Sequence, residues 1–317
     1  MLEREGRRLT IREAYAEASS FLRQSGVGEP ESNAERLLEH VLGETRSGML
    51  LRWAEPFPAE RESQWRQLLA RKAAGEPVQY IIGEQEFYGL PFRVGPAVLI
   101  PRPETELLVE EVVRLGRQLW PGADKGPANR SAAAGEERQA AAAAGPPVVC
   151  DVGTGSGAIA VVLAAQCPGW RVLGSDISAA ALETAKDNAA RLGVADRIEW
   201  AEGDLLRPWI ERGVRIDILV SNPPYIPEED EAGLQPEVRL FEPPSALYGG
   251  EDGLVLYRRM IAQLAELPAF PRIVAFEVGM GQAEVVQAWL RQAGEWEEVR
   301  IIDDLAGIGR HVIAWHV

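Results

Sequence analysis

The sequence predicts an α/β protein in which a small N-terminal helical bundle and a β-hairpin linker precede a doubly wound, mostly parallel seven-stranded sheet. Short apolar runs alternate with helical segments from residue 148 onward, a pattern typical of parallel strands that are buried on both faces. Residues 1–75 show helical periodicity alone. The chain has 317 residues, 46% of them hydrophobic, which suffices for one large and one smaller domain.

Residues 1–75 are expected to form the helical bundle. Thr10 with Glu13 three residues later is a capping-box pattern at the start of a first helix. A second helix is expected to begin near Pro30 and to end just before Gly43, the usual placement of these two residue types. The stretch "AERESQWRQLLARKAAG" predicts a further amphipathic helix. The bundle is equally consistent with a packing module and with a partner-docking domain.

Residues 76–102 are expected to be a β-hairpin linker, because "VQYIIGEQEFYGLPFRVGPAVLIP" places strand-like runs between Gly and Pro. Residues 103–317 form the large domain, which opens with a helix whose first turn carries Glu104 and Glu106.

Residues 121–147 interrupt that domain. Ten Ala, four Gly and four Pro make up most of these 27 residues. Such a segment buries too little apolar surface to offset its ordering entropy. We expect a disordered or partly helical insertion without a chemical role.

The sheet follows from seven strand-like runs, the first three of which are separated by helical segments. The first four are "VVCDVG", "RVLGSD", "RIEWAEGD" and "IDILVSN". The remaining three are "RIVAFEVG", "WEEVRIIDD" and "GRHVIAWHV". The last two are close enough in sequence to pair antiparallel.

Composition argues against several function classes. Residues 1–75 carry 12 basic and 12 acidic side chains, which leaves 21 basic and 36 acidic ones, and the whole net charge of -15, on residues 76–317. Binding to long nucleic acid usually needs a basic face, so a nucleic-acid substrate is disfavoured. No segment approaches the roughly 18 apolar residues of a membrane span, and we expect a soluble cytoplasmic protein without a membrane partner.

Cysteine and histidine do not suggest a metal site. The two cysteines, Cys150 and Cys167, stand in apolar settings and are expected to be core thiols. The three histidines, His40, His311 and His316, are scattered rather than set at ligand spacing.

A glycine-rich loop, "DVGTGSGAIA", follows the first strand of the sheet and opens a helix. Glycines let the backbone turn tightly and approach a ligand, and a helix N-terminus offers free N–H groups. The loop differs from the dinucleotide fingerprint G-x-G-x-x-G. A sterically required strand-to-helix turn is the alternative. The candidate binding residues are Gly153, Thr154, Gly155, Ser156 and Gly157.

Two acidic residues follow the next two strands. Asp176, 19 residues after Gly157, can accept both hydroxyls of a ribose. Asp204 and Leu205 can meet an adenine with an acceptor and an apolar wall. Each acid is also consistent with a helix cap or a solvated loop. The glycine loop has no Lys or Arg, which favours an adenosyl ligand without a pyrophosphate.

The fourth strand ends in "DILVSNPPYIP". The side-chain oxygen of Asn222 and the carbonyl of Pro223 can each accept a hydrogen bond from an NH2 group. Pro223 and Pro224 fix the turn before a substrate arrives, and Tyr225 can stack on a flat conjugated group. The turn therefore fits a planar nitrogen, either an amide or an exocyclic base amine. A plain rigid turn is the alternative.

In their order, "DVGTGSG", Asp176, "GDL" and "NPPY" resemble a class I methyltransferase that uses S-adenosyl-L-methionine. The further stretches "FYGLPFRV", "VLIPRPETE", "NPPYIP", "FEVGMGQ" and "DLAGIGR" resemble the protein-(glutamine-N5) methyltransferases that act on peptide chain release factors. The resemblance extends from about Leu9 to the end of the chain. "PRPETE" and "NPPY" together distinguish this family from most other methyltransferases.

The resemblance implies methyl transfer to the glutamine amide in the GGQ motif of release factors, with the helical bundle as the docking domain. The loop from Gly153 to Gly157 would line the methionine part of the cofactor. Asp176 would bind the ribose, and Asp204 with Leu205 would flank the adenine. Leu205 stands where some members have an aromatic residue, and the insertion is longer than is usual in the family.

The same resemblance implies that Asn222, Pro223, Pro224 and Tyr225 form the substrate turn, with Asn222 also near the cofactor. Arg102 and Glu104 of "PRPETE" would belong to an arm over the site, although a Pro-started helix explains that segment equally well.

An amide nitrogen is a poor nucleophile, so two acceptors on its N–H groups would orient it and stabilise its growing charge. No basic residue is then required, and the proton would leave late to water.

Two alternatives remain open at this point. The first is an N-methyltransferase acting on an exocyclic amine of adenine or guanine in nucleic acid. The second is a non-catalytic binding protein that keeps the adenosyl pocket as a scaffold.

Overall fold

The computed structural model describes residues 3–4, 7–123 and 145–317, which divide into two compact units. The N-terminal unit comprises the chain up to Glu84 together with Gln235–Phe241, and the sheet unit comprises Gln85–Leu234 and Glu242–Val317. Most of the insertion expected at 121–147 lies outside the described residues.

The N-terminal unit is helical around one apolar core. The predicted capping box is confirmed, because Thr10 accepts from the Glu13 N–H and the Glu13 carboxylate accepts from the Thr10 N–H. Gly43 ends the second helix in the left-handed conformation, with φ 67°. The elements are β1 (Glu3–Arg4), β2 (Arg7–Arg8), α1 (Ile11–Gln24), α2 (Pro30–Leu42), α3 (Arg46–Leu51), η1 (Ala59–Arg61), α4 (Glu62–Ala73), α5 (Val78–Ile82) and α11 (Pro236–Phe241).

The α11 segment joins this unit although it is far away in sequence. The Lys72 side chain is fully buried, and its Nζ donates to Oε1 of Glu237 in α11 at 2.6 Å and to the Glu76 carbonyl at 3.1 Å. A buried ammonium group needs such partners. This explains how a lysine can occupy the apolar face of α4.

The expectation of a strand at Val78–Ile82 is wrong, because these residues form the short helix α5 between Pro77 and Gly83. A short apolar run does not distinguish the two structures. The hairpin is confined to β3 (Glu84–Phe87) and β4 (Leu90–Arg93).

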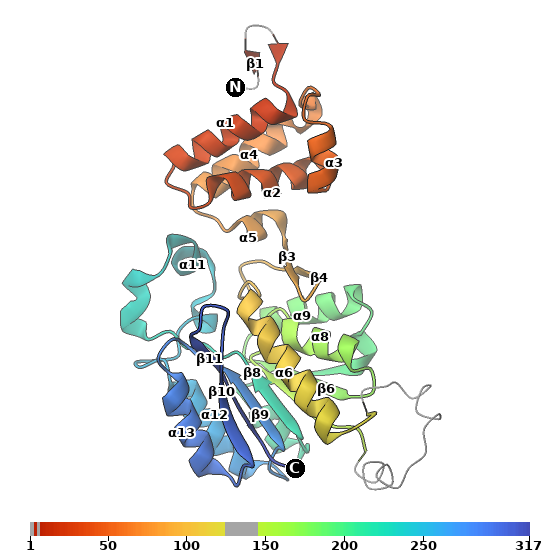
Figure 1. Cartoon of the computed structure of the whole chain (residues 1–317), viewed down its shortest axis with the longest axis vertical. Helices are drawn as coiled ribbons and strands as arrows, with labels where there is room; N and C mark the ends of the chain where they lie inside the picture. The colour runs from red at the N-terminus through yellow and green to blue at the C-terminus, as the bar shows by residue number, and fades with distance from the viewer. Residues whose placement is uncertain (1–2, 5–6, 124–144) are drawn as a thin grey trace. The chain divides into compact units, whose positions relative to one another are not determined.

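The predicted seven-stranded, mostly parallel sheet is confirmed (Figure 1). Its strand order is β10-β11-β9-β8-β5-β6-β7. Strands β5 to β9 pair in parallel, and β11 runs antiparallel to both of its neighbours. The strands are β5 (Val148–Val152), β6 (Arg171–Asp176), β7 (Ile198–Glu202), β8 (Ile218–Ser221), β9 (Ile273–Glu277), β10 (Glu298–Asp303) and β11 (Gly309–Trp315).

Helices cover both faces of this sheet, and each face has its own core. Helices α6, α8 and α9 pack on one face and α10, α12 and α13 on the other. Alternate residues of β5 enter the two cores, as with Val149 and Cys150. The bounds are α6 (Pro103–Leu119), α8 (Ala158–Gln166), α9 (Ala179–Arg191), η3 (Ala195–Arg197), α10 (Arg207–Glu211), η4 (Glu228–Gly233), η5 (Pro244–Ala246), α12 (Val255–Gln263), η6 (Leu264–Glu266) and α13 (Ala283–Ala293).

Both cysteines are buried, Cys150 in one of these cores and Cys167 in the other. Within the described ranges, no helix is long and apolar enough to cross a membrane.

Candidate functional site

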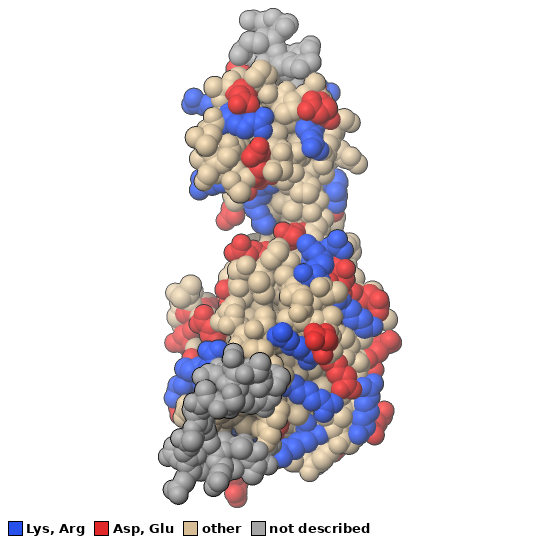
Figure 2. Space-filling model, turned by 90° about the vertical axis from the view of Figure 1, so that its right-hand side faces the viewer, with Lys and Arg blue, Asp and Glu red and all other residues tan. Residues whose placement is uncertain are grey.

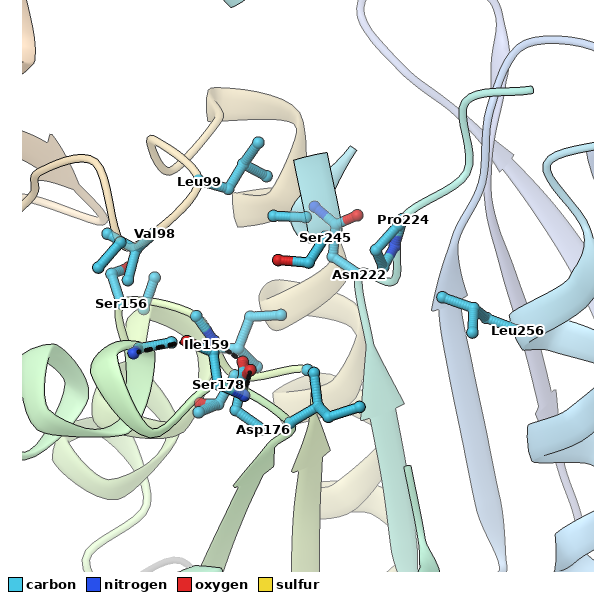
Figure 3. A pocket seen from close by; sticks show the side chains of 18 of the residues that line it. Val98, Leu99, Ser156, Ile159, Asp176, Ser178, Asn222, Pro224, Ser245 and Leu256 are labelled. Atoms are coloured by element: carbon cyan, nitrogen blue, oxygen red, sulfur yellow. Dashed lines mark hydrogen bonds between the residues drawn. The ribbon is translucent and has the colours of Figure 1, made fainter. Parts of the chain in front are cut away.

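A pocket of about 300 Å³ lies at the edge of the sheet where the parallel strands end. Strands β5 and β8 are neighbours although they are the first and fourth parallel strands along the chain. This makes the edge a topological switch point, where ligands of doubly wound folds bind. Asp176 ends β6, and Asn222 directly follows β8. Figure 3 shows both side chains in the pocket, with Val98 on one side and Leu256 on the other.

The glycine loop contributes Gly153, Thr154, Gly155 and Ser156 to the pocket lining. Gly153 and Gly155 have φ values of 71° and 56°, and a Cβ atom at either would meet nothing within 4 Å. The backbone of the loop therefore faces open space that a ligand can fill. Gly157 has a different role, because its Cβ would lie 3.0 Å from the Cβ of Ala185 in α9.

A buried carboxylate holds this loop from behind. Oδ2 of Asp151 accepts from Oγ1 of Thr154 at 2.6 Å and from the Ala160 N–H at 3.2 Å. Among the described residues, Oδ1 has no hydrogen-bond partner. Burial raises the pKa of Asp151 to about 7, against the opposing effect of its hydrogen bonds.

Asp176 lines the pocket with its carboxylate already oriented. Oδ2 accepts from the Gly155 N–H and Oδ1 from the Ser178 N–H, both at 2.9 Å. Burial raises its pKa, and these backbone donors oppose that shift. A carboxylate held in this way has further lone pairs for hydroxyl donors.

Asp204 and Leu205 also line the pocket. Asp204 pairs with Arg259 of α12. Arg259 also lines the pocket and was not predicted from the sequence. Leu205 has φ 53°, an uncommon conformation for a residue with a Cβ. Its carbonyl accepts from Oγ of Ser175 at 3.2 Å. This hydrogen bond links the loop after β7 to β6.

The four residues of the "NPPY" turn are placed differently from one another. Asn222 and Pro224 line the pocket, Pro223 is buried and Tyr225 is half-buried. Nδ2 of Asn222 donates to Oγ1 of Thr105 at 3.1 Å. Burial, with a further contribution from the charge of Glu277, raises the pKa of Tyr225 to about 12. The stacking role expected for Tyr225 stays a prediction.

The main chain of the turn is held by close packing. The Tyr225 carbonyl accepts from Nε2 of Gln282 at 2.9 Å, and Oε1 of Gln282 accepts from the Gly279 N–H at the same distance. A Cβ at Gly253 would lie 2.2 Å from the Tyr225 carbonyl oxygen, and one at Gly249 would lie 2.5 Å from that of Pro224. These supports were not predicted from the sequence, although the glycines of "YGGEDG" and "FEVGMGQ" indicated close packing.

The "PRPETE" segment is only partly at the pocket. Of its described residues, Arg102 and Thr105 are among those that line it, whereas Glu104 is not. Arg102 pairs with the buried Glu242, whose Oε2 accepts from the Ile100 N–H at 3.1 Å. The arm role expected for Arg102 and Glu104 stays a prediction.

On the face shown in Figure 2, basic and acidic side chains are interspersed rather than gathered into a basic strip. The part of the chain that the structure describes contains no group of three or more His, Cys, Asp or Glu side chains that could hold a metal ion.

Two family models match the chain. One is described as the PrmC N-terminal domain and covers residues 13–83, and the other as a methyltransferase domain and covers residues 149–243.

Two similar proteins carry the same name. The release factor glutamine methyltransferase of Bacillus anthracis is 40% identical over 307 residues, which are 96% of this chain and 99% of that protein. The protein of the same name from Bordetella pertussis is 42% identical over 286 residues, 89% of this chain and 94% of its own. Among solved structures, the N-terminal domain of human METTL16 is similar in fold, with a TM-score of 0.51 and 17% identity over 95% of this chain and 92% of that one.

Proposed function

The chain belongs to the release factor glutamine methyltransferase family, and from this premise we propose that it methylates the glutamine of the GGQ motif of peptide chain release factors. The methyl group passes from S-adenosyl-L-methionine to the side-chain amide nitrogen, N5. The predicted family is confirmed. The relatives favour this reaction over methylation of a nucleic-acid base.

The residues of the pocket fit an adenosyl cofactor. The open space beside Gly153 and Gly155 leaves room for the methionine part. Asp176 has acceptor capacity for the ribose hydroxyls at the end of β6, and Asp204 with Leu205 can flank the adenine. When bound, S-adenosyl-L-methionine supplies an electrophilic methyl group on its sulfonium sulfur.

The position of Asn222 is the main support for the proposal. Asn222 lies at the switch point and lines the same pocket as Asp176 (Figure 3). Its side-chain oxygen and the Pro223 carbonyl would accept the two N–H groups of the glutamine amide. These acceptors aim the nitrogen at the methyl carbon and stabilise the positive charge that develops on it. The methyl carbon would exchange its bond to sulfur for a bond to nitrogen, and the surplus proton would leave to water. The N-terminal unit is proposed to dock the release factor.

Transfer of labelled methyl to a purified release factor tests the function. The parallel substrates are a release factor whose GGQ glutamine is replaced by alanine, and bulk nucleic acid. We expect label on the unaltered factor alone. Label on nucleic acid alone would mean that the turn holds a base.

Asn222→Ala tests the site itself. We expect turnover to fall by roughly 10²- to 10³-fold, the range for loss of one preorganised polar contact to a transition state. Cofactor affinity, measured by calorimetry, should stay within a few-fold of the wild-type value. Near-normal turnover would remove Asn222 from the mechanism.

A further inference from the structure

Three side chains from separate elements form a continuous hydrogen-bonded chain behind the substrate turn. Nδ2 of Asn222, after β8, donates to Oγ1 of Thr105 in α6 at 3.1 Å. The Thr105 hydroxyl donates in turn to Oε2 of Glu277, at the end of β9, at 2.6 Å. Thr105 is 4% exposed and Glu277 is 1% exposed. Thr105 and Glu277 are therefore shielded from water, which would otherwise compete for their hydrogen bonds.

The chemistry of the three groups allows their two hydrogen bonds to run in only one donor-to-acceptor direction. An ionised carboxylate can only accept, and a hydroxyl has a single proton to donate. Once Thr105 donates to Glu277, its remaining capacity toward Asn222 is as an acceptor. Asn222 must then turn its NH2 group toward Thr105. Because the amide is planar, Oδ1 becomes the end available to a ligand.

We propose that Thr105 and Glu277 are positioning residues that fix the side-chain amide of Asn222 with its oxygen toward the substrate nitrogen. This rests on the proposed function, in which the substrate presents an NH2 group. If Asn222 were turned over, its own NH2 group would meet that of the substrate, and two donors would face each other. If the side-chain amide of Asn222 rotated freely, it would spend much of its time with the NH2 group toward the substrate.

A structural role alone does not account for Glu277. The side chains of its hydrogen-bonded chain, Thr105 and Asn222, are uncharged, and the charge of Arg310 only partly offsets the effect of burial on its pKa. Nε2 of His311 lies 3.9 Å from Oε2, but burial lowers the pKa of His311 to about 4, so the ring is neutral. A buried carboxylate of this kind destabilises a fold relative to an apolar side chain. Such groups occur preferentially at functional sites.

The donor-to-acceptor direction of these hydrogen bonds depends on the charge of Glu277. Burial raises the pKa of Glu277 to about 7, and the hydrogen bond from Thr105 is the largest opposing effect. Protonated Glu277 can donate to Thr105, which frees the Thr105 proton to point at Asn222 and reverses the amide. The polar and titratable groups that face Glu277 are Arg310, His311, Glu104, Tyr225, Tyr257, Thr105 and Asn222. Activity should therefore rise with pH as Glu277 ionises.

Thr105→Val and Thr105→Ser form the matched test of the hydroxyl. The valine keeps the branched shape and loses the hydroxyl, whereas the serine keeps the hydroxyl and loses the methyl group. With saturating cofactor, we expect Thr105→Val to lower kcat roughly 10- to 100-fold, with a smaller change in KM for the release factor. Thr105→Ser should return kcat to within about threefold of the wild type, by the same reasoning. Equal activity of the two variants would overturn the proposal.

Glu277→Gln tests the direction through the pH profile. We expect wild-type kcat to rise between pH 6 and 8 with an inflection near 7, the pKa of Glu277. The glutamine variant should lack this inflection and have lower kcat at pH 8, because an amide can donate as well as accept. An unchanged inflection in Glu277→Gln would overturn the role of Glu277. Thermal unfolding and cofactor titration of each variant identify any loss of folding.

A readout without substrate separates this proposal from the proposed function. The side-chain NH2 signals of Asn222, assigned by their loss in Asn222→Asp, should titrate near pH 7 in the wild type and not in Glu277→Gln. Failure of the wild type to label any release factor would refute the function and leave this titration intact. Absence of the titration in an enzyme that labels release factors would refute the positioning chain alone.

Discussion

Gly253→Ala tests whether close packing behind the "NPPY" turn sets its catalytic geometry. Gly253 has φ 71°, and an added Cβ would lie 2.2 Å from the carbonyl oxygen of Tyr225 and 2.7 Å from Nε2 of Gln282. Ordinary contact begins at 3.4 Å, so one backbone must move by roughly 1.2 Å. The carbonyl in this contact is the one that Gln282 holds by a hydrogen bond of 2.9 Å.

Two costs are expected. The left-handed conformation costs an alanine about 1 kcal/mol, and overpacking adds about 1–3 kcal/mol. A shift of about 1 Å in a positioning element can lower a rate by roughly 100-fold. We therefore expect Gly253→Ala to lower kcat/KM for the release factor by about that factor, with a smaller effect on cofactor affinity.

Gly213→Ala is the matched control. Gly213 also has a positive φ, 62°, but a Cβ there would meet nothing within 4 Å. The Gly213→Ala variant should have a free energy of unfolding lower by about 1 kcal/mol and should keep its methyltransferase activity. Methyl transfer and thermal unfolding are measured on both variants. Equal activity of the two would refute the reasoning, because it would show that the contact with Tyr225 does not matter.

Three further predictions concern charged groups. Asp176→Ala should weaken cofactor binding roughly 10- to 100-fold, the effect of losing hydrogen bonds to a charged acceptor, as measured by calorimetry. The pKa of Asp151 is raised to about 7 in the folded protein, so the folded state binds a proton that the unfolded chain has lost above about pH 4. Its stabilising contribution is complete below pH 4 and is lost as the pH rises toward 7. Asp151→Asn should accordingly show a smaller fall in Tm between pH 5 and 8 than the wild type, and an identical fall would contradict this assignment. Lys72→Met should lower the free energy of unfolding of the N-terminal unit by about 1–3 kcal/mol in denaturant titrations, because it leaves Glu237 without its partner. The expected loss is smaller than for a fully buried ion pair, since the Glu237 side chain is 33% exposed. An unchanged denaturation midpoint would show that the pair contributes little to stability.

The strand ends could be predicted from the sequence because polarity changes abruptly there. Asp176 and Asn222 each follow an apolar run, and parallel strands bring such positions to one edge. Their placement in one pocket agrees with that reasoning. The short apolar run at Val78–Ile82 was not predicted correctly, because helix and strand share its composition.

The supporting contacts were not predictable from local patterns. Thr105 is an ordinary residue in the first turn of a helix, and its partner Glu277 follows 172 positions later. Gln282 and Gly253 acquire their roles only when loops that are distant in sequence meet the turn. Pairings of this kind depend on tertiary structure, and a periodicity argument does not contain that information.

The pairing of Lys72 with Glu237 has a consequence for synthesis of the protein. The two residues are 165 positions apart, and a ribosome that adds about 5–20 residues per second needs roughly 8–33 s to cover that distance. During this interval the first helices have emerged while α11 has not yet been made. The nascent bundle must hold the ammonium group of Lys72 without its carboxylate partner, at a position that is buried in the finished protein. Completion of the first unit therefore waits until three quarters of the polypeptide has been translated.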